Sequence, residues 1–355
     1  MTSMMLENIL SQFGLIEEKC KIIKLGTGLI NHTWIIDCGD KSYILQKINH
    51  LVFKNPEVID SNTAQLKHFL NKFYPDYLFV PPVNTLEGIS LIETPDGFFR
   101  LFDYVEQSVT INFVNSEKEA YEAAKQFGKF TSLLAHFNTS NLGVPLPDFH
   151  NLALRYEQFG MACQNGNPER IEETKEAIAA LQSFKIIVDT YNNIVEKRLL
   201  PLRVMHHDTK ISNILFDEYE QGLCVIDLDT VMPGYYISDV GDMMRTYLSP
   251  ANEEEKNLEK VVIRKEIFKA IYKGYMSELG KELSEIEKQY FIYSGKFIIY
   301  MQALRFLTDY INNDIYYGAS YPKHNLVRAN NQIKLLQEYM NAEKDFETII
   351  KEIQF

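Results

Sequence analysis

Hydrophobic and polar residues alternate along much of the first hundred residues, and this period of two predicts β-strands. Two strand-like runs lie within residues 22–37, and a third covers residues 42–48. Thr94-Pro95-Asp96-Gly97 is a strong turn signal between two further strands, residues 89–93 and 98–105. A short amphipathic helix over residues 4–13 is expected before the first strand. The N-terminal part should therefore be a small, β-rich unit.

From Ser116 onward the apolar residues recur at helical spacing. Ser116 begins a capping box, and a helix that packs in the core is predicted to follow it. More helix is predicted over residues 169–197, and a second capping box at Ser284 begins the strongest helix, whose apolar stripe extends to Ile311. Asp242 is expected to be the N-cap of another helix. A β-rich part followed by a mainly helical part predicts an α+β protein.

One polar stretch between two apolar runs has the spacing of a phosphoryl-transfer site. His206 and Asp208 begin an H-x-D-x-x-x-x-N pattern that ends at Asn213, and a second apolar run leads to Asp227 and Asp229. In the protein-kinase catalytic loop, the base Asp stands five residues before a metal-binding Asn, and a metal-binding Asp follows. This spacing predicts Asp208 as the base that accepts the hydroxyl proton. His206 is expected to brace the loop.

The two apolar runs predict a hairpin, with strands at 213–216 and 223–226 and a polar turn at 217–222. If the second strand continued, Asp227 and Asp229 would project to the same face, where Asn213 can join them around one cation. Magnesium accepts a small set of oxygen ligands and keeps water molecules. Asn213, Asp227 and Asp229 are therefore the predicted Mg2+ ligands.

This stretch resembles the aminoglycoside phosphotransferase and choline kinase superfamily, small-molecule kinases of protein-kinase-like fold. The longer string from Asp208 to Gly234 is similar to that of bacterial N-acetylhexosamine 1-kinases, and an acid-x-Gly-Asp run followed by Arg245 extends the likeness. The resemblance implies a bilobal fold, with a nucleotide-binding lobe over residues 1–104 and a catalytic and substrate-binding lobe over residues 105–355. ATP and Mg2+ would bind between the lobes.

The resemblance also implies the nucleotide site. By its position between two strands, the segment Gly26-Thr27-Gly28 corresponds to the nucleotide loop, although Gly-x-Gly alone would indicate an ordinary turn. Asn31 and Thr33 fit the pattern of that loop. The family places a phosphate-binding basic residue on the third strand. Here Gln46 stands at that point and Lys47 follows, and since adjacent strand residues face opposite ways, either could face the nucleotide.

Other expected contacts are less specific. Glu57 and Asp60 are candidates for the acid that pairs with the phosphate-binding residue. The adenine-binding hinge is placed near residues 102–105, so that Phe102 and Tyr104 are nucleotide-binding candidates. Arg305 is predicted to bind the sugar together with Asp208, and the alternative is a surface ion pair between Arg305 and Asp309. Tyr317 is a candidate for stacking on a sugar face.

Composition limits the partners. The chain has 355 residues, is 46% hydrophobic and has a net charge of -12, which argues against nucleic acid and anionic membranes as partners. No signal peptide or membrane-spanning run is evident, so a cytoplasmic protein is expected. Cys20, Cys38, Cys163 and Cys224 are expected to be free thiols. The oligomeric state, monomer or dimer, is left open.

Together these features predict ATP-dependent phosphorylation of the anomeric hydroxyl of N-acetylglucosamine or N-acetylgalactosamine. Two alternatives remain open. The acceptor could be another small molecule, of the aminoglycoside, choline or homoserine type. The chain could also be an inactive nucleotide-binding module, as the irregular Gln46-Lys47 region suggests.

Overall fold

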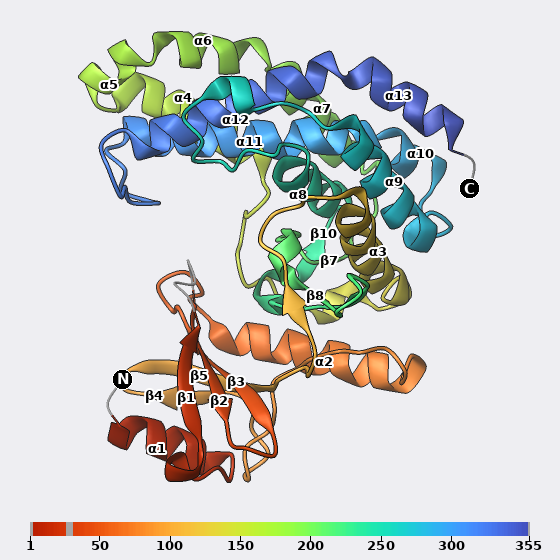
Figure 1. Cartoon of the computed structure of the whole chain (residues 1–355). Helices are drawn as coiled ribbons and strands as arrows, with labels where there is room; N and C mark the ends of the chain where they lie inside the picture. The colour runs from red at the N-terminus through yellow and green to blue at the C-terminus, as the bar shows by residue number, and fades with distance from the viewer. Residues whose placement is uncertain (1–2, 26–30, 354–355) are drawn as a thin grey trace.

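A computed structural model describes residues 3–25 and 31–353 of the chain. The protein has the predicted α+β architecture, in which antiparallel strands gather in the N-terminal part and helices build most of the remainder (Figure 1). In Figure 1 the small sheet lies at one end and the helical part at the other. The lobe boundary proposed from the sequence, residue 104, falls directly after the last long strand of the small sheet.

The N-terminal part is a five-stranded antiparallel sheet in the order β1-β2-β3-β5-β4. The helix α1 (Ser3–Gln12) covers one face of this sheet, and its Leu6, Ile9 and Leu10 pack against Leu45 and Phe99. Because β-strand side chains alternate between faces, the residues next to Leu45 and Phe99 project to the opposite face. The strands are β1 (Lys21–Leu25), β2 (His32–Asp37), β3 (Ser42–Ile48), β4 (Ile92–Thr94) and β5 (Gly97–Asp103).

The opposite face of the sheet meets α2 (Pro56–Phe73), which lies between the sheet and the helical part (Figure 1). Ile48 and Ile59 are buried together in one small apolar cluster. One turn further along α2, the Asn62 side chain donates to the backbone oxygen of Val231 at 3.1 Å and to that of Gly143 at 3.0 Å. The helix α2 therefore connects the small sheet to the segment that follows Asp229.

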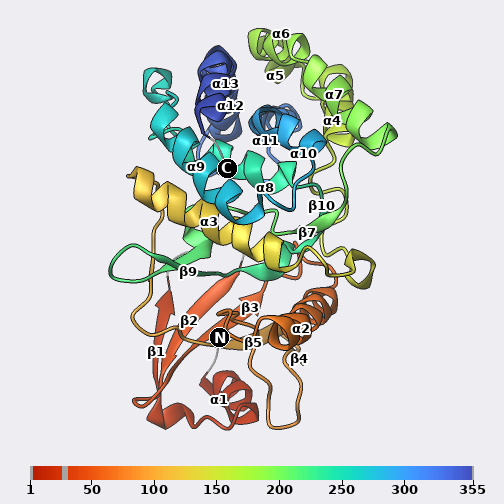
Figure 2. The same cartoon turned by 90° about the vertical axis from the view of Figure 1, so that its right-hand side faces the viewer.

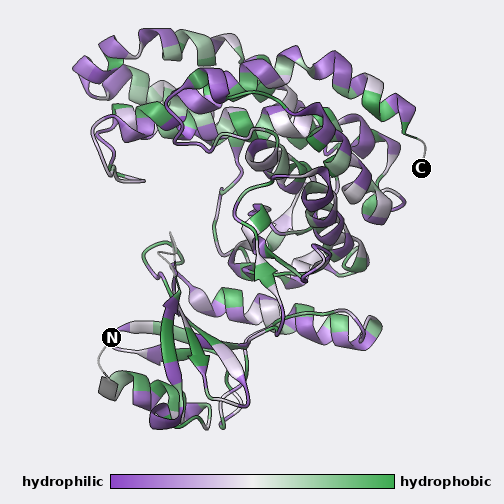
Figure 3. Cartoon of the chain, viewed as in Figure 1, coloured by the Kyte–Doolittle hydropathy of each residue, from purple (hydrophilic) through white to green (hydrophobic). Residues whose placement is uncertain are grey.

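The remainder of the chain is a helical assembly with two small sheets at its base. The buried helix α11 packs on α8, α12 and α4, while α3 runs along α9 beneath them (Figure 2). In Figure 3 these helices alternate hydrophilic and hydrophobic segments, as expected for helices that bury one face. The helices are α3 (Glu117–Leu133), α4 (Leu152–Asn165), α5 (Pro168–Glu173), α6 (Lys175–Ser183), α7 (Ile186–Glu196), α8 (Ile237–Tyr247), α9 (Lys265–Leu279), α10 (Glu285–Gln289), α11 (Phe291–Ile311), α12 (His324–Asn341) and α13 (Glu343–Glu352).

The two small sheets hold the segment with the kinase-like spacing. One pairs β10 with β7, and the other has the order β6-β8-β9. The predicted hairpin is present as β8 and β9, joined by a polar turn. The strands are β6 (Val109–Thr110), β7 (Arg203–Met205), β8 (Ile214–Phe216), β9 (Gly222–Val225) and β10 (Met232–Gly234).

Several element boundaries differ from the predictions. The predicted helix over 169–197 is three helices, α5, α6 and α7. The capping box at Ser284 is confirmed, but the helix that it begins is short, and the chain turns at Tyr290 before α11. Asp242 is not an N-cap, because α8 already begins at Ile237 and Asp242 lies inside it. Tyr290, at the break before α11, still continues the apolar stripe, which explains why the pattern missed this break.

The expectation of four free thiols is wrong for two cysteines. Cys20 and Cys38 form a disulfide between the start of β1 and the end of β2, whereas Cys163 and Cys224 are free. Strand pairing brings residues 20 and 38 together, since Lys21 lies opposite Asp37, and spacing along the chain could not show this. Among the described helices, none is both long and apolar enough to cross a membrane.

Candidate active site

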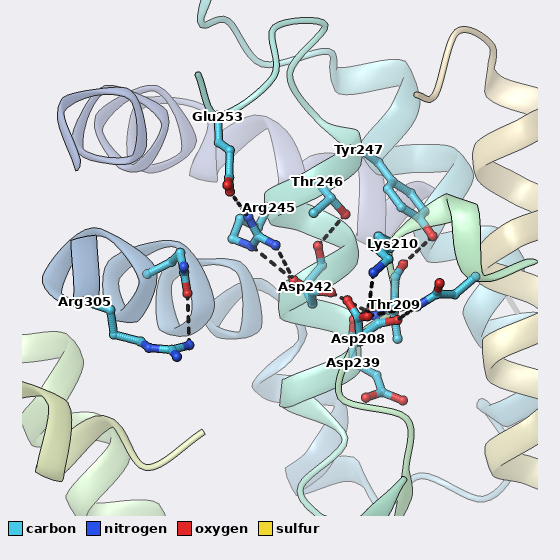
Figure 4. A network of polar contacts seen from close by, with 12 residues as sticks. Asp208, Thr209, Lys210, Asp239, Asp242, Arg245, Thr246, Tyr247, Glu253 and Arg305 are labelled. Carbon is cyan, nitrogen blue, oxygen red and sulfur yellow. Dashed lines mark hydrogen bonds and ion pairs between the residues drawn. The ribbon is translucent and has the colours of Figure 1, made fainter. Parts of the chain in front are cut away.

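The segment from His206 to Asn213, called the catalytic loop below, leaves β7 and enters β8 through a short 3-10 helix (Ile211–Asn213). Its backbone is held by two carboxylates of α8. Asp239 accepts hydrogen bonds from the backbone N–H groups of His206 at 2.9 Å and His207 at 2.7 Å. Asp242 accepts from the N–H of Thr209 at 2.8 Å. Figure 4 shows Asp239 and Asp242 close to Asp208 and Thr209 of the loop.

Asp239 and Asp242 are buried, and burying a carboxylate is costly unless it is hydrogen-bonded, as both are here. Burial raises the pKa of Asp239 to about 7, although the two backbone N–H groups of the loop oppose that rise. Asp242 is also bound by Arg245, whose Nε lies 3.0 Å from it. The function of the acid-x-Gly-Asp run is therefore to fix the catalytic loop, which the N-cap interpretation of Asp242 missed.

His206 is fully buried beneath the catalytic loop. Its Nε2 lies 2.9 Å from the backbone oxygen of Ile226, and its ring packs edge-on against Phe127 with centroids 5.2 Å apart. Burial lowers the pKa of His206, which favours the neutral ring. In this position His206 ties the loop to the residue before Asp227 and has no free coordination site.

Asp208 projects from the loop with a partly exposed carboxylate. Its Oδ2 accepts from Lys210 Nζ at 2.8 Å and from Asn213 Nδ2 at 3.0 Å. Burial acts to raise the pKa of Asp208, but Lys210, together with His206 and Asn213, outweighs burial and lowers it. The carboxylate is therefore ionised at neutral pH, as a general base must be.

Asp227 does not continue β9, which ends at Val225; it has a left-handed backbone with φ 60° and ψ 61°. The prediction that Asp227 and Asp229 alternate along a strand is wrong, since a 3-10 helix (Leu228–Thr230) separates their directions. Left-handed conformations are unfavourable for residues other than glycine and concentrate at functional sites. Burial and the nearby Asp229 raise the pKa of Asp227 to about 7.

The oxygen atoms next to Asp227 suit a hard cation. No described residue donates a hydrogen bond to the Asp227 carboxylate or to Oδ1 of Asn213. The N–H of Ile226 donates to the backbone oxygen of Asn213 at 2.9 Å, and this bond keeps Asp227 next to Asn213. No three His, Cys, Asp or Glu side chains gather as a metal site in the described parts of the chain. A carboxylate and an amide oxygen fit Mg2+, which completes its shell with water and phosphate oxygens.

Asp229, the third predicted metal ligand, is bound by the small sheet instead. It is buried, and its Oδ2 accepts from Asn31 Nδ2 at 2.8 Å. Its Oδ1 pairs with Arg100 of β5. Asn31, the predicted nucleotide-loop residue, also accepts the N–H of Asn49 at 3.0 Å. Two side chains of the N-terminal part thus hold a carboxylate two residues after Asp227.

Strand register separates Gln46 from Lys47. Gln46 lies opposite Arg100 and Thr33, on the face that reaches Asp229. Lys47 shares the opposite face with Leu45, and its Nζ lies 5.7 Å from the ring centroid of Phe99. Lys47 therefore points away from Asp229, contrary to its prediction as a phosphate ligand. The predicted loop Gly26-Thr27-Gly28 lies outside the described residues.

The expected acid partners are also placed elsewhere. Asp60 accepts from the Ser90 hydroxyl at 2.5 Å, and Glu57 is exposed on α2. At the end of β5, Phe102 lies beneath the guanidinium group of Arg100, 5.1 Å away, and the N–H of Tyr104 pairs with the Ser42 oxygen at 3.1 Å. The adenine contacts of Phe102 and Tyr104 stay predictions.

Arg305 lies on α11 and does not pair with Asp309. Asp309 instead accepts the N–H groups of Tyr316 and Tyr317 at 2.7 and 2.9 Å, so the surface-pair alternative is wrong. The guanidinium group lies 5.3 Å from the Tyr317 ring centroid and 5.6 Å from that of Phe149. The neighbouring His150 ring is 5.2 Å from His207. Figure 4 shows Arg305 extending from α11 on the side where Asp208 lies.

The surroundings of Arg305 are cationic. Arg155 lies close to Arg305. Its pKa is lowered by burial, and secondly by the positive charge of Arg305. Of the carboxylates in this region, Asp314 pairs with Arg170 at 2.6 Å, Glu253 pairs with Arg245 at 2.9 Å and with Arg328, and Asp148 lies close enough to Arg155 to act against the lowering of its pKa. Among the described residues, no carboxylate hydrogen-bonds to Arg305. Arg155 and Arg305 would therefore repel a positively charged acceptor, and Asp148 would act against that repulsion.

Residues 21–258 match the model of the phosphotransferase enzyme family, whose members transfer phosphoryl groups. The chain belongs to this family. Its fold agrees with solved structures over nearly the whole length. A spectinomycin phosphotransferase, in complex with ADP and spectinomycin, has a TM-score of 0.61 at 15% identity, covering 96% of this chain and 99% of that one. The expected aminoglycoside phosphotransferase type of fold is thus confirmed.

Two other structures show the breadth of the fold. A microcompartment-associated aminopropanol kinase has a TM-score of 0.62 at 15% identity, with 97% of this chain and 98% of that one covered. A choline kinase from Cryptosporidium parvum Iowa II has a TM-score of 0.60 at 12% identity, with 98% of each chain covered. These similarities show that the chain shares its fold with both kinases.

The sequence interpretation missed three groups of this phosphotransferase. Lys210 stands two residues after Asp208, a position that could have been assigned from the loop spacing. Arg100 is the one charged residue in the apolar run Phe98–Phe102, a signal that a side chain serves something other than the core. Asp239 could not have been assigned, since its partners are backbone groups more than thirty residues away.

Proposed function

We propose that the phosphotransferase transfers the terminal phosphoryl group of ATP to the anomeric hydroxyl of an N-acetylhexosamine, N-acetylglucosamine or N-acetylgalactosamine, and releases the sugar 1-phosphate. The observation that carries the choice of acceptor is the setting of Arg305, which lies among aromatic rings with no carboxylate partner among the described residues. A guanidinium fork donates well to neutral sugar and amide oxygens, while it repels cations such as choline or an aminoglycoside.

Each residue has a part in this reaction. Asp208 orients the acceptor hydroxyl and accepts its proton, and Lys210 keeps that carboxylate ionised. Asp227 and Asn213 would hold Mg2+, which neutralises phosphate charge when bound. Asn31, Thr33, Phe102 and Tyr104 are proposed to contact ATP from the small sheet, and Tyr317 supports Arg305.

Two further features belong to the proposal. Adenine nucleotide use is supported by the ADP in the complex of the similarly folded spectinomycin phosphotransferase. A cytoplasmic location is proposed because ATP and magnesium are abundant there. The inactive-module alternative is disfavoured, because Asp208 and Asn213 are hydrogen-bonded within the catalytic loop and Asp227 follows Ile226, whose N–H bonds to the Asn213 oxygen.

An acceptor panel tests the proposal. ADP release is measured at fixed Mg-ATP with N-acetylglucosamine, N-acetylgalactosamine, glucose, choline, homoserine and spectinomycin. The fastest turnover is expected with an N-acetylhexosamine. Faster turnover with choline or spectinomycin would overturn the assignment of Arg305 to a neutral acceptor. ATP binding without turnover of any acceptor would support the inactive module.

A further inference from the structure

The face of the small sheet that looks toward Asp229 has a buried guanidinium group. Arg100 of β5 is only 4% exposed. Its Nε and Nη2 both donate to Oε1 of Gln46, at 3.0 and 2.6 Å, and Nη2 also pairs with Asp229. The Phe102 ring lies under the group, 5.1 Å from Cζ. A charge with three such neighbours is held in one orientation.

The partners of Arg100 leave part of the group available. Nη1 donates to no described residue. Two N–H bonds thus remain beside the carboxylate that follows the proposed metal ligand Asp227. Guanidinium N–H groups in this geometry suit phosphate oxygens.

Strand β3, where the family resemblance places the phosphate-binding basic residue, has no positive charge on the face toward Asp229. At the β3 position, Gln46 is neutral and faces Arg100, while Lys47 faces α1 on the other side of the sheet. No helix α2 acid takes part either, because Asp60 is bonded to Ser90. The positive charge is thus on β5, at Arg100, and not on β3. Its acid partner is Asp229, in the segment after Asp227, and not a residue of α2.

We propose that Arg100 is the phosphate-binding cation of the nucleotide site, positioned by Gln46 and Asp229, in place of a basic residue on β3. This inference rests on the proposed function as a nucleotide-dependent kinase and adds the residue that binds the phosphates. Asp229 then has a positioning role, because it orients Arg100 and Asn31 from the opposite lobe.

Direct binding to the purified full chain tests the assignment without any acceptor. The dissociation constants of ADP and adenosine are measured by calorimetry and by competition, with and without Mg2+. Arg100→Met is expected to weaken ADP binding at least tenfold and to leave adenosine binding within twofold, because adenosine lacks phosphate. Lys47→Met is expected to leave both unchanged. Arg170→Met, which breaks a half-buried ion pair with Asp314 in the helical part, controls for loss of such a pair.

Relocating the charge separates binding from folding. The double variant Gln46→Lys/Arg100→Met restores a cation on the same face beside Asp229, and it is expected to recover most of the ADP affinity. Thermal unfolding checks that each variant is folded. If Arg100→Met does not fold, the double variant and Arg100→Lys, expected to lose three- to tenfold in ADP affinity, still decide the question.

Three results would overturn the proposal. They are normal ADP binding by Arg100→Met, equal weakening of ADP and adenosine, which would make Arg100 only a lobe connector, and a loss caused by Lys47→Met instead. Failure of the proposed function has a different signature. In that case the unaltered chain binds ADP in an Arg100-dependent way but phosphorylates no N-acetylhexosamine.

Discussion

The ammonium group of Lys210 lies 2.8 Å from Oδ2 of Asp208, on the same loop and only two residues away. The same oxygen accepts from Asn213, so one oxygen of the predicted base is occupied by two donors and the other is left for the acceptor hydroxyl. Because Lys210 is also close to Asp227, it adds positive charge where the phosphates would be neutralised. Lys210 thus contributes both to the acceptance of the proton by Asp208 and to the neutralisation of phosphate charge.

Replacing Lys210 by Met should change the pH profile as well as the rate. Lys210 lowers the pKa of Asp208, so its removal raises that pKa, and a base must be ionised to act. The acidic limb of kcat/KM should therefore move to higher pH, with the plateau lowered by about 10²-fold. The measurement is kcat/KM from pH 5 to pH 9, with Lys185→Met, which breaks only an exposed pair, as the control. An unchanged acidic limb would contradict the assignment.

Asp208→Asn should fold and bind both substrates yet lose most of kcat. The amide has nearly the same shape as the carboxylate but cannot accept the hydroxyl proton, and loss of a general base typically costs about 10²–10⁴-fold. Steady-state kinetics with Asp40→Asn, a substitution on the exposed hairpin turn, as control separates kcat from KM. A loss confined to KM would make Asp208 a positioning residue.

Asp227→Asn is expected to stabilise the chain while removing activity. Burial and Asp229 raise the pKa of Asp227 to about 7, against about 3.9 in an unfolded chain. The folded state therefore holds this proton more tightly, and the contribution of Asp227 to stability falls as pH rises from about 4 to about 7. At pH 8 without magnesium, Asn should raise the unfolding free energy by about 1–3 kcal/mol.

The corresponding measurement is chemical unfolding of both proteins at pH 5 and pH 8, with and without Mg2+. The gain from Asn should be smaller at pH 5, where Asp227 is protonated, and Mg2+ should stabilise only the unaltered chain. Asp40→Asn again serves as the control. Equal stabilisation of both proteins by Mg2+ would place the cation elsewhere.

Sequence patterns predicted the parts of the site that depend on local spacing. Strand β3 was predicted with its observed ends, and the hairpin after Asn213 was also expected, since alternation and turn residues are local signals. The resemblance predicted the order of the two lobes. Asp227 was expected to lie near Asn213 in space, and the Ile226 N–H bonds to the Asn213 oxygen. Its left-handed backbone was not foreseen, because strand alternation cannot show a break in the strand.

The remaining features depend on contacts between distant residues. Arg100 and Asp229 are 129 positions apart, and no periodicity connects them. Which of Gln46 and Lys47 faces the site is decided by packing on α1, a helix far from both in sequence. Similarly, the loop-bracing bonds of Asp239 join its side chain to backbone groups, which have no sequence signature.

Arg305→Lys should reduce the affinity for the sugar more than the affinity for ATP. Lysine keeps the charge but loses the planar fork and its contacts with the Tyr317 and Phe149 rings. The KM for the N-acetylhexosamine is expected to rise by about 5–30-fold, and the KM for ATP by less than about twofold. The control is Arg203→Lys, which alters a forked contact with Glu287 away from the acceptor side. Equal changes in both constants would remove Arg305 from the acceptor site.

The position of the new phosphate is the most direct chemical test of the proposed reaction. An anomeric hydroxyl is more acidic than the other sugar hydroxyls, because the ring oxygen withdraws electron density from its carbon. A carboxylate of lowered pKa such as Asp208 is a weak base, and it faces an easier proton transfer at that hydroxyl. The expected product is a glycosyl phosphate, whose C–O bond breaks in mild acid through an oxocarbenium ion. Phosphorylation at carbon 1 also locks the ring, so reducing power should disappear as phosphate is incorporated.

The assay treats the products from N-acetylglucosamine and N-acetylgalactosamine with mild acid and measures released phosphate and reducing sugar together. Both are expected to appear in equal amounts. A 6-phosphate standard has no oxocarbenium route and should survive the same treatment. An acid-stable product that still reduces would place the phosphate on another hydroxyl, and Asp208 would then act on a less acidic group. Such a result would leave the family assignment intact, because the family is shown independently of the acceptor.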